Sequence, residues 1–425
     1  MKISELIQAT NAKVFGNYDK DLEIQISTDT RTIKKGDVYL PLQGASFDGE
    51  KFIPQAIERG AVGVFCTSVP IREGLFLQVE NTLTAYLQLA NYYRNKLNPI
   101  VVAVTGSSGK TTIKEIISST LESKYKVFKT PLNYNNEIGL CQTIFAMPND
   151  IEVLVLEMGM RGLGEIELLS KYAQPDITVV SNVGTAHIGR LGSRENIAKA
   201  KCEIVKHQRG NVFIAHDDVL IKDVIDFDGE KIFYSIRDVN IIERQVNYSK
   251  FEYQDNIYEL NVSGDFNIEN TLSAINVGKK LGLSIEEIQK GLKNYKPIEK
   301  RWEALKVDGY EIINDSYNAN PESMKAFVDT IFDLYDNYLL ILGDMGELGE
   351  DEIEYHKEIG EYIYKKNPQA RIVTIGNLAK YIGEPNFLTL KDAVDYIKSN
   401  ISKDTKIFLK ASRSMKFEKI IELLR

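Results

Sequence analysis

The segment TGSSGKTT at residues 105–112 constrains the fold of this chain more than any other feature. It directly follows the apolar run IVVAV and directly precedes a helical stretch. A strand, a glycine-rich turn and a helix in this order are typical of a phosphate-binding loop, in which backbone N–H groups and the positive end of the helix dipole face the phosphates. In such a loop Lys110 reaches the β- and γ-phosphate oxygens and Thr111 binds magnesium. The spacing between Gly106 and Gly109 is shorter than in the common GxxxxGK[ST] pattern.

The alternative is a chance Gly/Ser turn that enters a helix, and the order of strand, loop and helix disfavours it. The sequence therefore predicts a nucleotide site in an α/β domain. The predicted nucleotide contacts of the loop are Thr105, Gly106, Ser107, Ser108, Gly109, Lys110, Thr111 and Thr112.

A site that transfers or hydrolyses a phosphoryl group also needs a carboxylate at the end of a neighbouring strand to hold the metal. Glu157 closes the apolar run VLVLE and fits this role; a salt-bridged structural Glu is the alternative. His187 follows the run DITVVSN and would reach the same carboxyl edge of a parallel sheet, where ligands bind. Because a lone His is often a structural residue, its position alone leaves both interpretations open.

The length of 425 residues is about three times the usual ~150 for one domain, so several domains are expected. Runs typical of strands alternate with helical stretches throughout, which predicts three α/β domains at residues 1–98, 99–297 and 298–425. Pro99 and Pro297 mark the boundaries, and we expect hinges there. The expected strands lie at 24–27, 37–42, 61–65, 75–79, 100–106, 153–157, 176–182, 211–215, 310–316, 338–344, 371–376 and 406–412.

Three longer features are expected beside these strands. A helix is predicted from Thr82 to about Lys96, and a helical pair at 268–281 and 284–294. Short alternating runs between about Lys231 and Ser263 predict antiparallel hairpins appended to the central parallel sheet.

The balance of 52 Lys plus Arg against 60 Asp plus Glu gives a net charge of −8, which disfavours nucleic acid as a partner. The three cysteines are far apart and show no CxxC spacing, so we expect reduced thiols. The N-terminal residues do not resemble a signal peptide, and no apolar run approaches the ~20 residues that span a bilayer. A cytoplasmic protein without a membrane span is therefore expected, and we expect a monomer.

The chain resembles the Mur ligase superfamily over essentially its whole length. The resemblance rests on TGSSGKTT, on LEMGM around Glu157, on NVGTAHIGRLGS around His187, and on AKAKCEI at 198–204. It implies a small N-terminal α/β domain for a UDP-linked substrate, a central P-loop parallel-sheet ATPase domain and a C-terminal Rossmann-like domain for the incoming amine. It also implies that Lys201 is carbamylated and binds a second Mg²⁺ together with Glu157 and His187. Without the resemblance, a solvated helix lysine would be the preferred interpretation of Lys201.

Other motifs resemble the superfamily member that adds D-alanyl-D-alanine to UDP-N-acetylmuramoyl-tripeptide through an acyl phosphate, a step of peptidoglycan precursor synthesis. They are TPLNYNNEIG at 130–139, NDSYNANPESM at 314–324, LGDMGELG at 342–349 with His356 following, and KASRSMKFE at 410–418. The chain departs from the family's patterns at KRWE (300–303), KASR (410–413), GDFN (264–267) and DGEKF (48–52). These departures concern contacts with the substrates and leave the implied chemistry unchanged.

The resemblance assigns further residues, position by position. On the ATP and metal side these are Lys110, Thr111, Glu157, His187, Lys201, Asn267, Asn270, Arg301 and Asp315. On the side of the UDP-linked substrate and the dipeptide these are Ser27, Asp29, Thr30, Arg31, Thr130, Asn135, Asn136 and Asn318. The STDTR segment taken alone is also compatible with an ordinary polar turn.

Two alternatives remain open. One is a sister ligase that adds a single amino acid to a UDP-linked peptide, which the sequence at 318–321 (Asn-Ala-Asn-Pro) disfavours. The other is a non-catalytic protein that binds a nucleotide or a UDP-sugar, which the complete set of predicted metal ligands disfavours.

Overall fold

The computed structural model describes residues 1–44, 47–69, 73–245, 247–297 and 300–425. These residues form two compact units. The first contains 1–100, 130–151 and 171–174, and the second contains 101–129, 152–170 and 175–425. The proposed boundary between 297 and 298 falls at residues 298–299, which lie outside the described residues.

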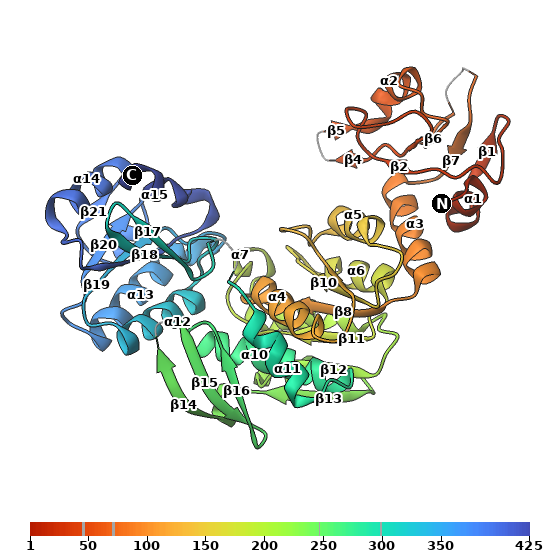
Figure 1. Cartoon of the computed structure of the whole chain (residues 1–425). Helices are drawn as coiled ribbons and strands as arrows, with labels where there is room; N and C mark the ends of the chain where they lie inside the picture. The colour runs from red at the N-terminus through yellow and green to blue at the C-terminus, as the bar shows by residue number, and fades with distance from the viewer. Residues whose placement is uncertain (45–46, 70–72, 246, 298–299) are drawn as a thin grey trace. The chain divides into compact units, whose positions relative to one another are not determined.

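The first unit is built on a small mixed sheet with the strand order β1-β7-β6-β3-β2 (Figure 1). Only β1 runs antiparallel to its neighbour β7. The predicted strand at 37–42 is shorter than expected, because Pro41 has no backbone N–H to donate to a ladder. The elements are α1 (Ile3–Thr10), β1 (Lys13–Phe15), β2 (Ile26–Ser27), β3 (Val38–Tyr39), β4 (Gln43–Gly44), β5 (Phe47–Asp48), α2 (Ile53–Glu58), β6 (Gly63–Cys66), β7 (Phe76–Gln78), α3 (Thr82–Leu97) and α5 (Glu137–Ala146).

The second unit contains the predicted central sheet, with the strand order β13-β12-β11-β8-β10-β9. Strand β11 pairs in parallel with β8 and β12, and β10 pairs in parallel with β9. The central strands are buried along almost their whole length, as expected for a parallel sheet covered by helices. Its elements are β8 (Ile100–Thr105), α4 (Lys110–Leu121), β9 (Val127–Lys129), β10 (Val153–Glu157), α6 (Glu165–Ala173), β11 (Ile177–Val180), α7 (Ile188–Leu191), α8 (Arg194–Cys202), β12 (Val212–His216), α9 (Val219–Val224) and β13 (Glu230–Tyr234).

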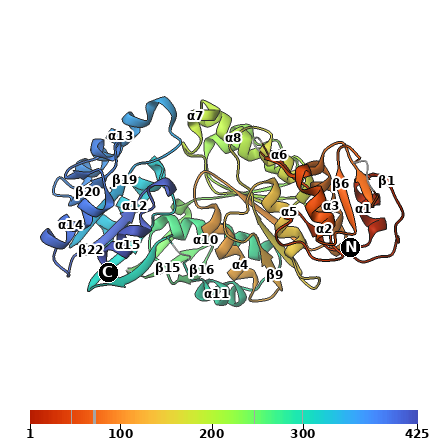
Figure 2. The same cartoon turned by 90° about the horizontal axis from the view of Figure 1, so that it is seen from above.

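The segment from 231 to 263 differs from the prediction. Strand β13 pairs with β12 in parallel and extends the central sheet, so it is not part of a hairpin. The antiparallel strands β14 (Val239–Gln245), β15 (Tyr248–Tyr253) and β16 (Asn256–Leu260) form a separate three-stranded sheet. Helices α10 (Asp265–Lys280) and α11 (Ile285–Asn294) follow, and both lie beside α4 (Figures 1 and 2).

The last sheet has the order β17-β18-β22-β19-β20-β21, and all its pairs are parallel except β17 with β18. This arrangement confirms the predicted second doubly wound fold. Its elements are β17 (Glu303–Val307), β18 (Tyr310–Asn314), α12 (Pro321–Leu334), β19 (Tyr338–Gly343), α13 (Glu352–Lys366), β20 (Ile372–Ile375), β21 (Asn386–Phe387), α14 (Leu390–Asn400), β22 (Lys406–Lys410) and α15 (Glu418–Leu424).

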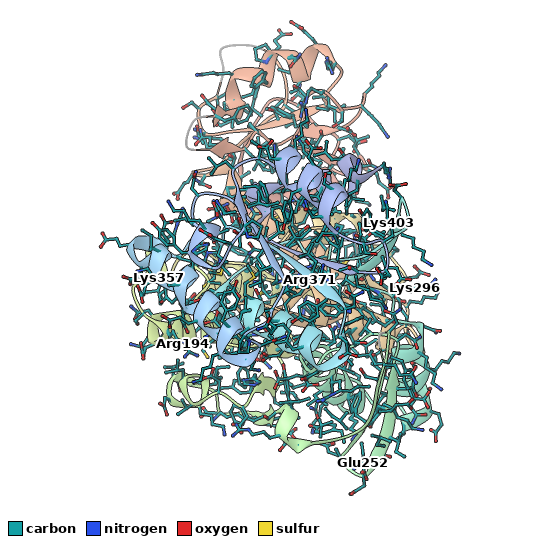
Figure 3. All side chains as sticks on the ribbon, turned by 90° about the vertical axis from the view of Figure 1, so that its left-hand side faces the viewer. Arg194, Glu252, Lys296, Lys357, Arg371 and Lys403 are labelled. Carbon is teal, nitrogen blue, oxygen red and sulfur yellow. The ribbon has the colours of Figure 1, made fainter. Side chains whose placement is uncertain are left out.

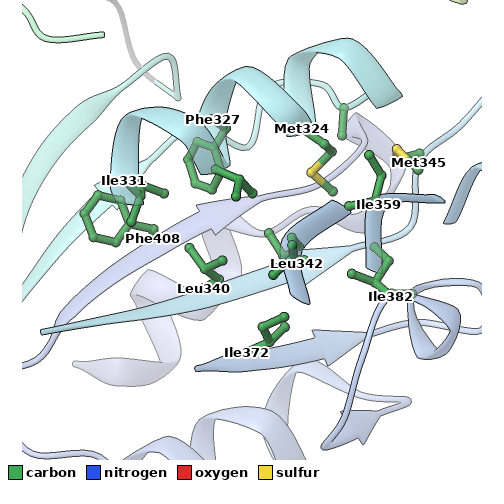
Figure 4. Close-up of a cluster of buried hydrophobic side chains, with 14 of the residues drawn as sticks. Met324, Phe327, Ile331, Leu340, Leu342, Met345, Ile359, Ile372, Ile382 and Phe408 are labelled. Carbon is green, nitrogen blue, oxygen red and sulfur yellow. The ribbon is translucent and has the colours of Figure 1, made fainter. Parts of the chain in front are cut away.

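One face of this sheet packs against α12 and α13 through a continuous apolar core (Figure 4). Met324, Phe327 and Ile331 lie on one side of α12, at helical spacing, and contact residues such as Leu340 and Phe408. The carboxyl ends of β18, β19 and β22 carry the motifs at 314–324, 342–349 and 410–418, so the fold brings these three motifs to one edge.

Charged side chains such as Glu252, Lys357 and Lys403 point outward from the second unit (Figure 3). No helix among the described residues has the length and apolar character to cross a membrane. All three cysteines are free, as the sequence predicts. All three are also buried.

Candidate active site

The phosphate-binding loop connects β8 to α4, as predicted. Gly106 has φ 154° and Gly109 has φ 79°, and both values disfavour any other residue. A Cβ on Gly106 would lie 1.7 Å from the Ser181 Oγ, so a side chain has no room there. The loop therefore needs these two glycines for its backbone path and for close packing against β11.

The segment after β11 holds the loop in place. Ser107 N–H donates to the Asn182 carbonyl at 3.1 Å, and Ser108 N–H donates to the Asn182 side-chain oxygen at 3.0 Å. Ser181 Oγ donates to the Ser108 carbonyl at 2.6 Å. These contacts fix the loop before any ligand binds, which lowers the entropy cost of binding.

Lys110 and Thr111 occupy the first turn of α4. Lys110 Nζ donates to the Gly106 carbonyl at 2.8 Å, so the side chain lies over its own loop. Burial lowers the pKa of Lys110; Glu157 opposes this effect and Arg301 adds to it. The Thr111 hydroxyl accepts a hydrogen bond from Arg301 at 2.9 Å. The structure thus brings the predicted phosphate ligands Lys110, Thr111 and Arg301 together.

Glu157 lies at the carboxyl end of β10 and is only 5% exposed. Its Oε2 lies 3.9 Å from the Nζ of Lys114, a fully buried lysine one helical turn after Lys110. Lys114 also contacts Glu115 at 3.1 Å, and Glu115 pairs with Lys129 at 2.6 Å. A chain of alternating charges therefore runs from β9 through α4 to Glu157 and compensates for the burial of its carboxylate.

His187 directly precedes α7 as its N-cap residue and has the left-handed φ of 67°. Its Nδ1 lies 2.7 Å from the Oε2 of Glu347, although the geometry is not that of a hydrogen bond. Glu347 also has a positive φ of 62°, and its contact with His187 lowers its pKa. Two residues in an uncommon backbone conformation thus meet at one point, which is typical of a functional site.

Lys201 lies on α8 and is 1% exposed. Among the described residues no carboxylate lies within ion-pair distance of its amine. Burial lowers its pKa well below the usual value, and the nearby Lys110 lowers it further. The alternative of a solvated helix lysine is therefore wrong, because this side chain is buried.

Within the described part of the chain, no group of three or more His, Cys, Asp and Glu side chains is arranged to hold a metal. Glu157 and His187 would need further oxygen donors, and the Thr111 hydroxyl, nucleotide phosphates and a carbamate on Lys201 are suitable hard ligands. A carbamate would also replace a buried cation without a counter-charge by an anion. The residues present therefore fit a magnesium site.

The residues predicted to contact the ATP base and ribose all lie in the second unit. Asn270 on α10 lies against the loop, since a Cβ on Gly109 would approach its Oδ1 to 2.8 Å. Asn267 donates to the Ser263 carbonyl at 2.6 Å. Asp315 pairs with Lys410 at 2.5 Å and accepts a hydrogen bond from Trp302 N–H.

The STDTR turn lies in the first unit. Arg31 donates from Nε and Nη2 to the Asp29 carboxylate, which lowers the pKa of Asp29 to about 2. Thr30 is buried and donates to Gln55 at 2.7 Å, so its hydroxyl is engaged within the fold. Ser27 Oγ donates to the Asp29 carbonyl. The accessible groups of this turn are therefore the Asp29–Arg31 pair.

The other predicted substrate residues lie at several points of the chain. Thr130 is buried, and Asn136 begins α5, where it accepts a hydrogen bond from Gly139 N–H at 2.9 Å. Asn135 lies between them, in the same loop. Asn318 is exposed and its carbonyl accepts a hydrogen bond from Lys410.

Sequence reasoning missed four charged residues of the site: Lys114, Glu322, Glu347 and Arg413. Glu322, at the start of α12, accepts hydrogen bonds from the Thr185 N–H and hydroxyl at 3.0 Å. Glu322, Glu347 and Arg413 lie within the motifs at 314–324, 342–349 and 410–418, whereas Lys114 lies two residues after TGSSGKTT. No signal in the sequence shows which of these side chains faces the site. His356, in contrast, accepts a hydrogen bond from Met345 N–H and supports the 342–349 loop from within the core.

Family models match three parts of the chain. The Mur ligase family catalytic domain matches residues 25–99, the Mur ligase middle domain matches 104–278, and the Mur ligase glutamate ligase domain matches 300–413. The three matches agree with the predicted three-domain architecture. The exact domain bounds stay a prediction.

Individual proteins match nearly the whole chain. The UDP-N-acetylmuramoyl-tripeptide--D-alanyl-D-alanine ligase of Bacillus subtilis is 37% identical over 99% of this chain and 96% of its own length. The crystal structure of MurF from Acinetobacter baumannii has a TM-score of 0.92 at 27% identity and covers 100% of this chain and 98% of its own. MurF from Thermotoga maritima in complex with ADP has a TM-score of 0.87 at 28% identity and covers 95% of this chain and 97% of its own.

Proposed function

Since this chain belongs to the Mur ligase family, we propose that it is the ATP-dependent ligase that joins D-alanyl-D-alanine to UDP-N-acetylmuramoyl-tripeptide. The observation that supports this proposal is the phosphate-binding loop, where Lys110 interacts electrostatically with Glu157, Glu347 and the buried Lys201, and where His187 contacts Glu347. The B. subtilis relative, matched from end to end, supports the choice of substrates.

The nucleotide would be ATP, bound together with Mg²⁺. The ADP complex of the T. maritima relative supports nucleotide binding at this fold. Thr111 would hold one ion with the phosphates, and Glu157, His187 and a carbamate on Lys201 would hold the second. Bound metal neutralises the charge that spreads over the transferred phosphoryl oxygens.

The chain's own residues supply positioning and charge. Lys110 leaves the Gly106 carbonyl to bind the β- and γ-phosphates, and Arg301 moves from the Thr111 hydroxyl to the transferred oxygens. The tripeptide carboxylate then attacks the γ-phosphorus in line and gives an acyl phosphate and ADP. The dipeptide amine attacks the acyl carbon, the C–N bond forms, and phosphate leaves.

The Asp29–Arg31 pair of the first unit is proposed to bind the uridine diphosphate part of the other substrate. Its carboxylate can accept from a uracil N–H, and its guanidinium can pair with a diphosphate. Because the reaction would consume ATP and a UDP-linked precursor, we place it in the cytoplasm. The monomeric state expected from the sequence stays a prediction.

Phosphate release from ATP tests this function. The purified chain is assayed with UDP-N-acetylmuramoyl-tripeptide and D-alanyl-D-alanine, with each omitted in turn, and the product mass is determined. We expect release only when both are present, with a pentapeptide product. Release with a single amino acid in place of the dipeptide would assign the chain to a sister ligase. No release under any combination would support a non-catalytic binding protein.

A further inference from the structure

Two guanidinium groups gather on one aromatic ring beside the nucleotide site. The Cζ of Arg301 lies 4.1 Å and the Cζ of Arg413 lies 5.4 Å from the centroid of the Tyr317 ring. Tyr317 comes from the motif at 314–324 and Arg413 from the motif at 410–418, which meet at the carboxyl edge of the last sheet. Tyr317 is itself fixed, because its N–H donates to the Lys300 carbonyl at 3.1 Å.

The described residues give neither guanidinium a close counter-charge, although Glu418 interacts electrostatically with Arg413. In the part of the chain that the structure describes, no carboxylate forms an ion pair with Arg301 or Arg413. Two nearby carboxylates already have cations of their own, because Glu418 pairs with Lys300 at 3.2 Å and Asp315 pairs with Lys410 at 2.5 Å. Two unpaired cations on one ring repel each other, and bound anions would relieve this repulsion.

The two arginines face different parts of the reaction. Arg301 donates to the Thr111 hydroxyl on the phosphate-binding loop, so its anion is a phosphate of the nucleotide. Arg413 contacts the same Tyr317 ring, is exposed, and forms no hydrogen bond with the described residues of the phosphate-binding loop. It is thus available for a second anion.

The incoming dipeptide brings such an anion. Its amine must reach the acyl carbon formed next to Arg301, and its carboxylate lies at the other end of two residues, ~7 Å away when extended. The distances of the two guanidinium carbons from the Tyr317 centroid set an upper limit on their separation, and this limit exceeds the length of the dipeptide. We propose that Arg413 binds the C-terminal carboxylate of the dipeptide and so makes the enzyme select a two-residue substrate with a free carboxylate. This inference rests on the proposed function.

The local structure suits this role. Arg413 begins the short 3₁₀ helix Arg413–Met415, which directly follows the buried end of β22. Ser412 N–H donates to the Asp344 carbonyl at 3.0 Å, and Phe417 is fully buried just after the helix. A well-anchored backbone therefore presents a side chain that forms no ion pair among the described residues, although Glu418 acts on it electrostatically. An arginine can bind a carboxylate through two parallel hydrogen bonds.

The test compares Arg413→Gln with wild type on two substrates, D-alanyl-D-alanine and its C-terminal amide. For wild type we expect KM for the amide to exceed KM for the dipeptide by roughly 10- to 100-fold, the range of a hydrogen-bonded charge. In Arg413→Gln, KM for the dipeptide should rise to about the value for the amide, while kcat and the KM values for ATP and the UDP-linked peptide change little. Arg413→Lys should restore part of the discrimination.

The matched control is Arg371→Gln, which removes an exposed arginine at the amino end of β20, the opposite edge of the same sheet. It should keep the wild-type preference for the dipeptide. If Arg413→Gln retains that preference, or if its KM rises for ATP instead, the inference is wrong while the proposed function stands. If wild type fails to use the dipeptide at all, the proposed function fails and this inference fails with it.

Discussion

Lys114 and Lys201 are both buried lysines, yet their surroundings differ. Lys114 has the carboxylates of Glu115 and Glu157 beside it. Lys201, in contrast, has no carboxylate within ion-pair distance among the described residues. A buried cation without a counter-charge is costly, and a neutral amine or a carbamate removes that cost. The two lysines should therefore respond differently to substitution.

Lys201→Gln should lower ligase activity by at least about 100-fold, because it removes a group that the metal site needs. Lys199→Gln on the exposed side of the same helix is the control and should keep activity. Wild type in ¹³C-bicarbonate should show a carbamate signal in NMR spectra that Lys201→Gln lacks. The signal should weaken as the pH falls, because only the neutral amine takes up carbon dioxide. An identical spectrum in both proteins would contradict the carbamate.

Lys114→Met should lower the free energy of unfolding by about 3–5 kcal/mol, since it removes the buried cation beside the buried carboxylate of Glu157 and the partly buried carboxylate of Glu115. Urea denaturation measures this loss. Lys124→Met removes a half-exposed lysine that lies 4.0 Å from Glu287, and we expect a change below about 1 kcal/mol. Equal losses in the two variants would show that the buried charge chain does not stabilise the fold.

Lys110, Thr111, Glu157 and His187 could be found from the sequence because each lies directly after a buried strand or in a glycine-rich turn. Glu347 and Arg413 could not, because their contacts with His187 and Tyr317 join segments that are far apart in the chain. Only the tertiary fold of the second unit brings Glu347 to His187 and Arg413 to Tyr317.

At the scale of elements, the closest approach near His187 involves two glycines. A Cβ on Gly189 in α7 would lie 2.7 Å from the Cα of Gly349, which begins the 3₁₀ helix Gly349–Asp351. The two segments therefore touch through their backbones. This contact places Glu347 against His187.

Gly189→Ala should separate the two segments and lower activity roughly 10- to 100-fold, because small displacements of positioned groups are costly. Circular dichroism should show an unchanged helix content. Gly162→Ala is the control, since a Cβ there meets only Glu165 at 3.7 Å. Full activity in Gly189→Ala would show that the contact does not matter for catalysis.

The elements also show where pattern reasoning fails. The buried strands β8, β10 and β11 were predicted within a few residues, because continuous apolar runs between helices mark a covered parallel sheet. Strand β13 lies at the edge of that sheet and begins with the exposed residues Glu230 and Lys231, so it lacks the continuous apolar run of the central strands. Its parallel pairing with β12 depends on the tertiary fold and leaves no mark in the local sequence.

At the scale of the whole molecule, the two units hold different predicted ligand groups. The STDTR turn lies in the first unit, whereas the phosphate-binding loop, Asn270 and Arg301 lie in the second. Amide hydrogen exchange with each ligand in turn should show which of the two predicted sites that ligand protects. We expect ADP with Mg²⁺ to protect amides of 105–112, and a UDP-linked muramoyl peptide to protect amides of 27–31. Protection of 27–31 by ADP alone would contradict this division.

The most direct test of the proposed chemistry is the transfer of oxygen from the peptide to phosphate. UDP-N-acetylmuramoyl-tripeptide carrying ¹⁸O in its terminal carboxylate is turned over with ATP and D-alanyl-D-alanine, and the phosphate is analysed by mass. An acyl phosphate requires that one carboxylate oxygen leaves with the phosphoryl group, so one ¹⁸O should appear in each phosphate released. Phosphate without the label, formed together with the pentapeptide, would contradict activation of the carboxylate at this site.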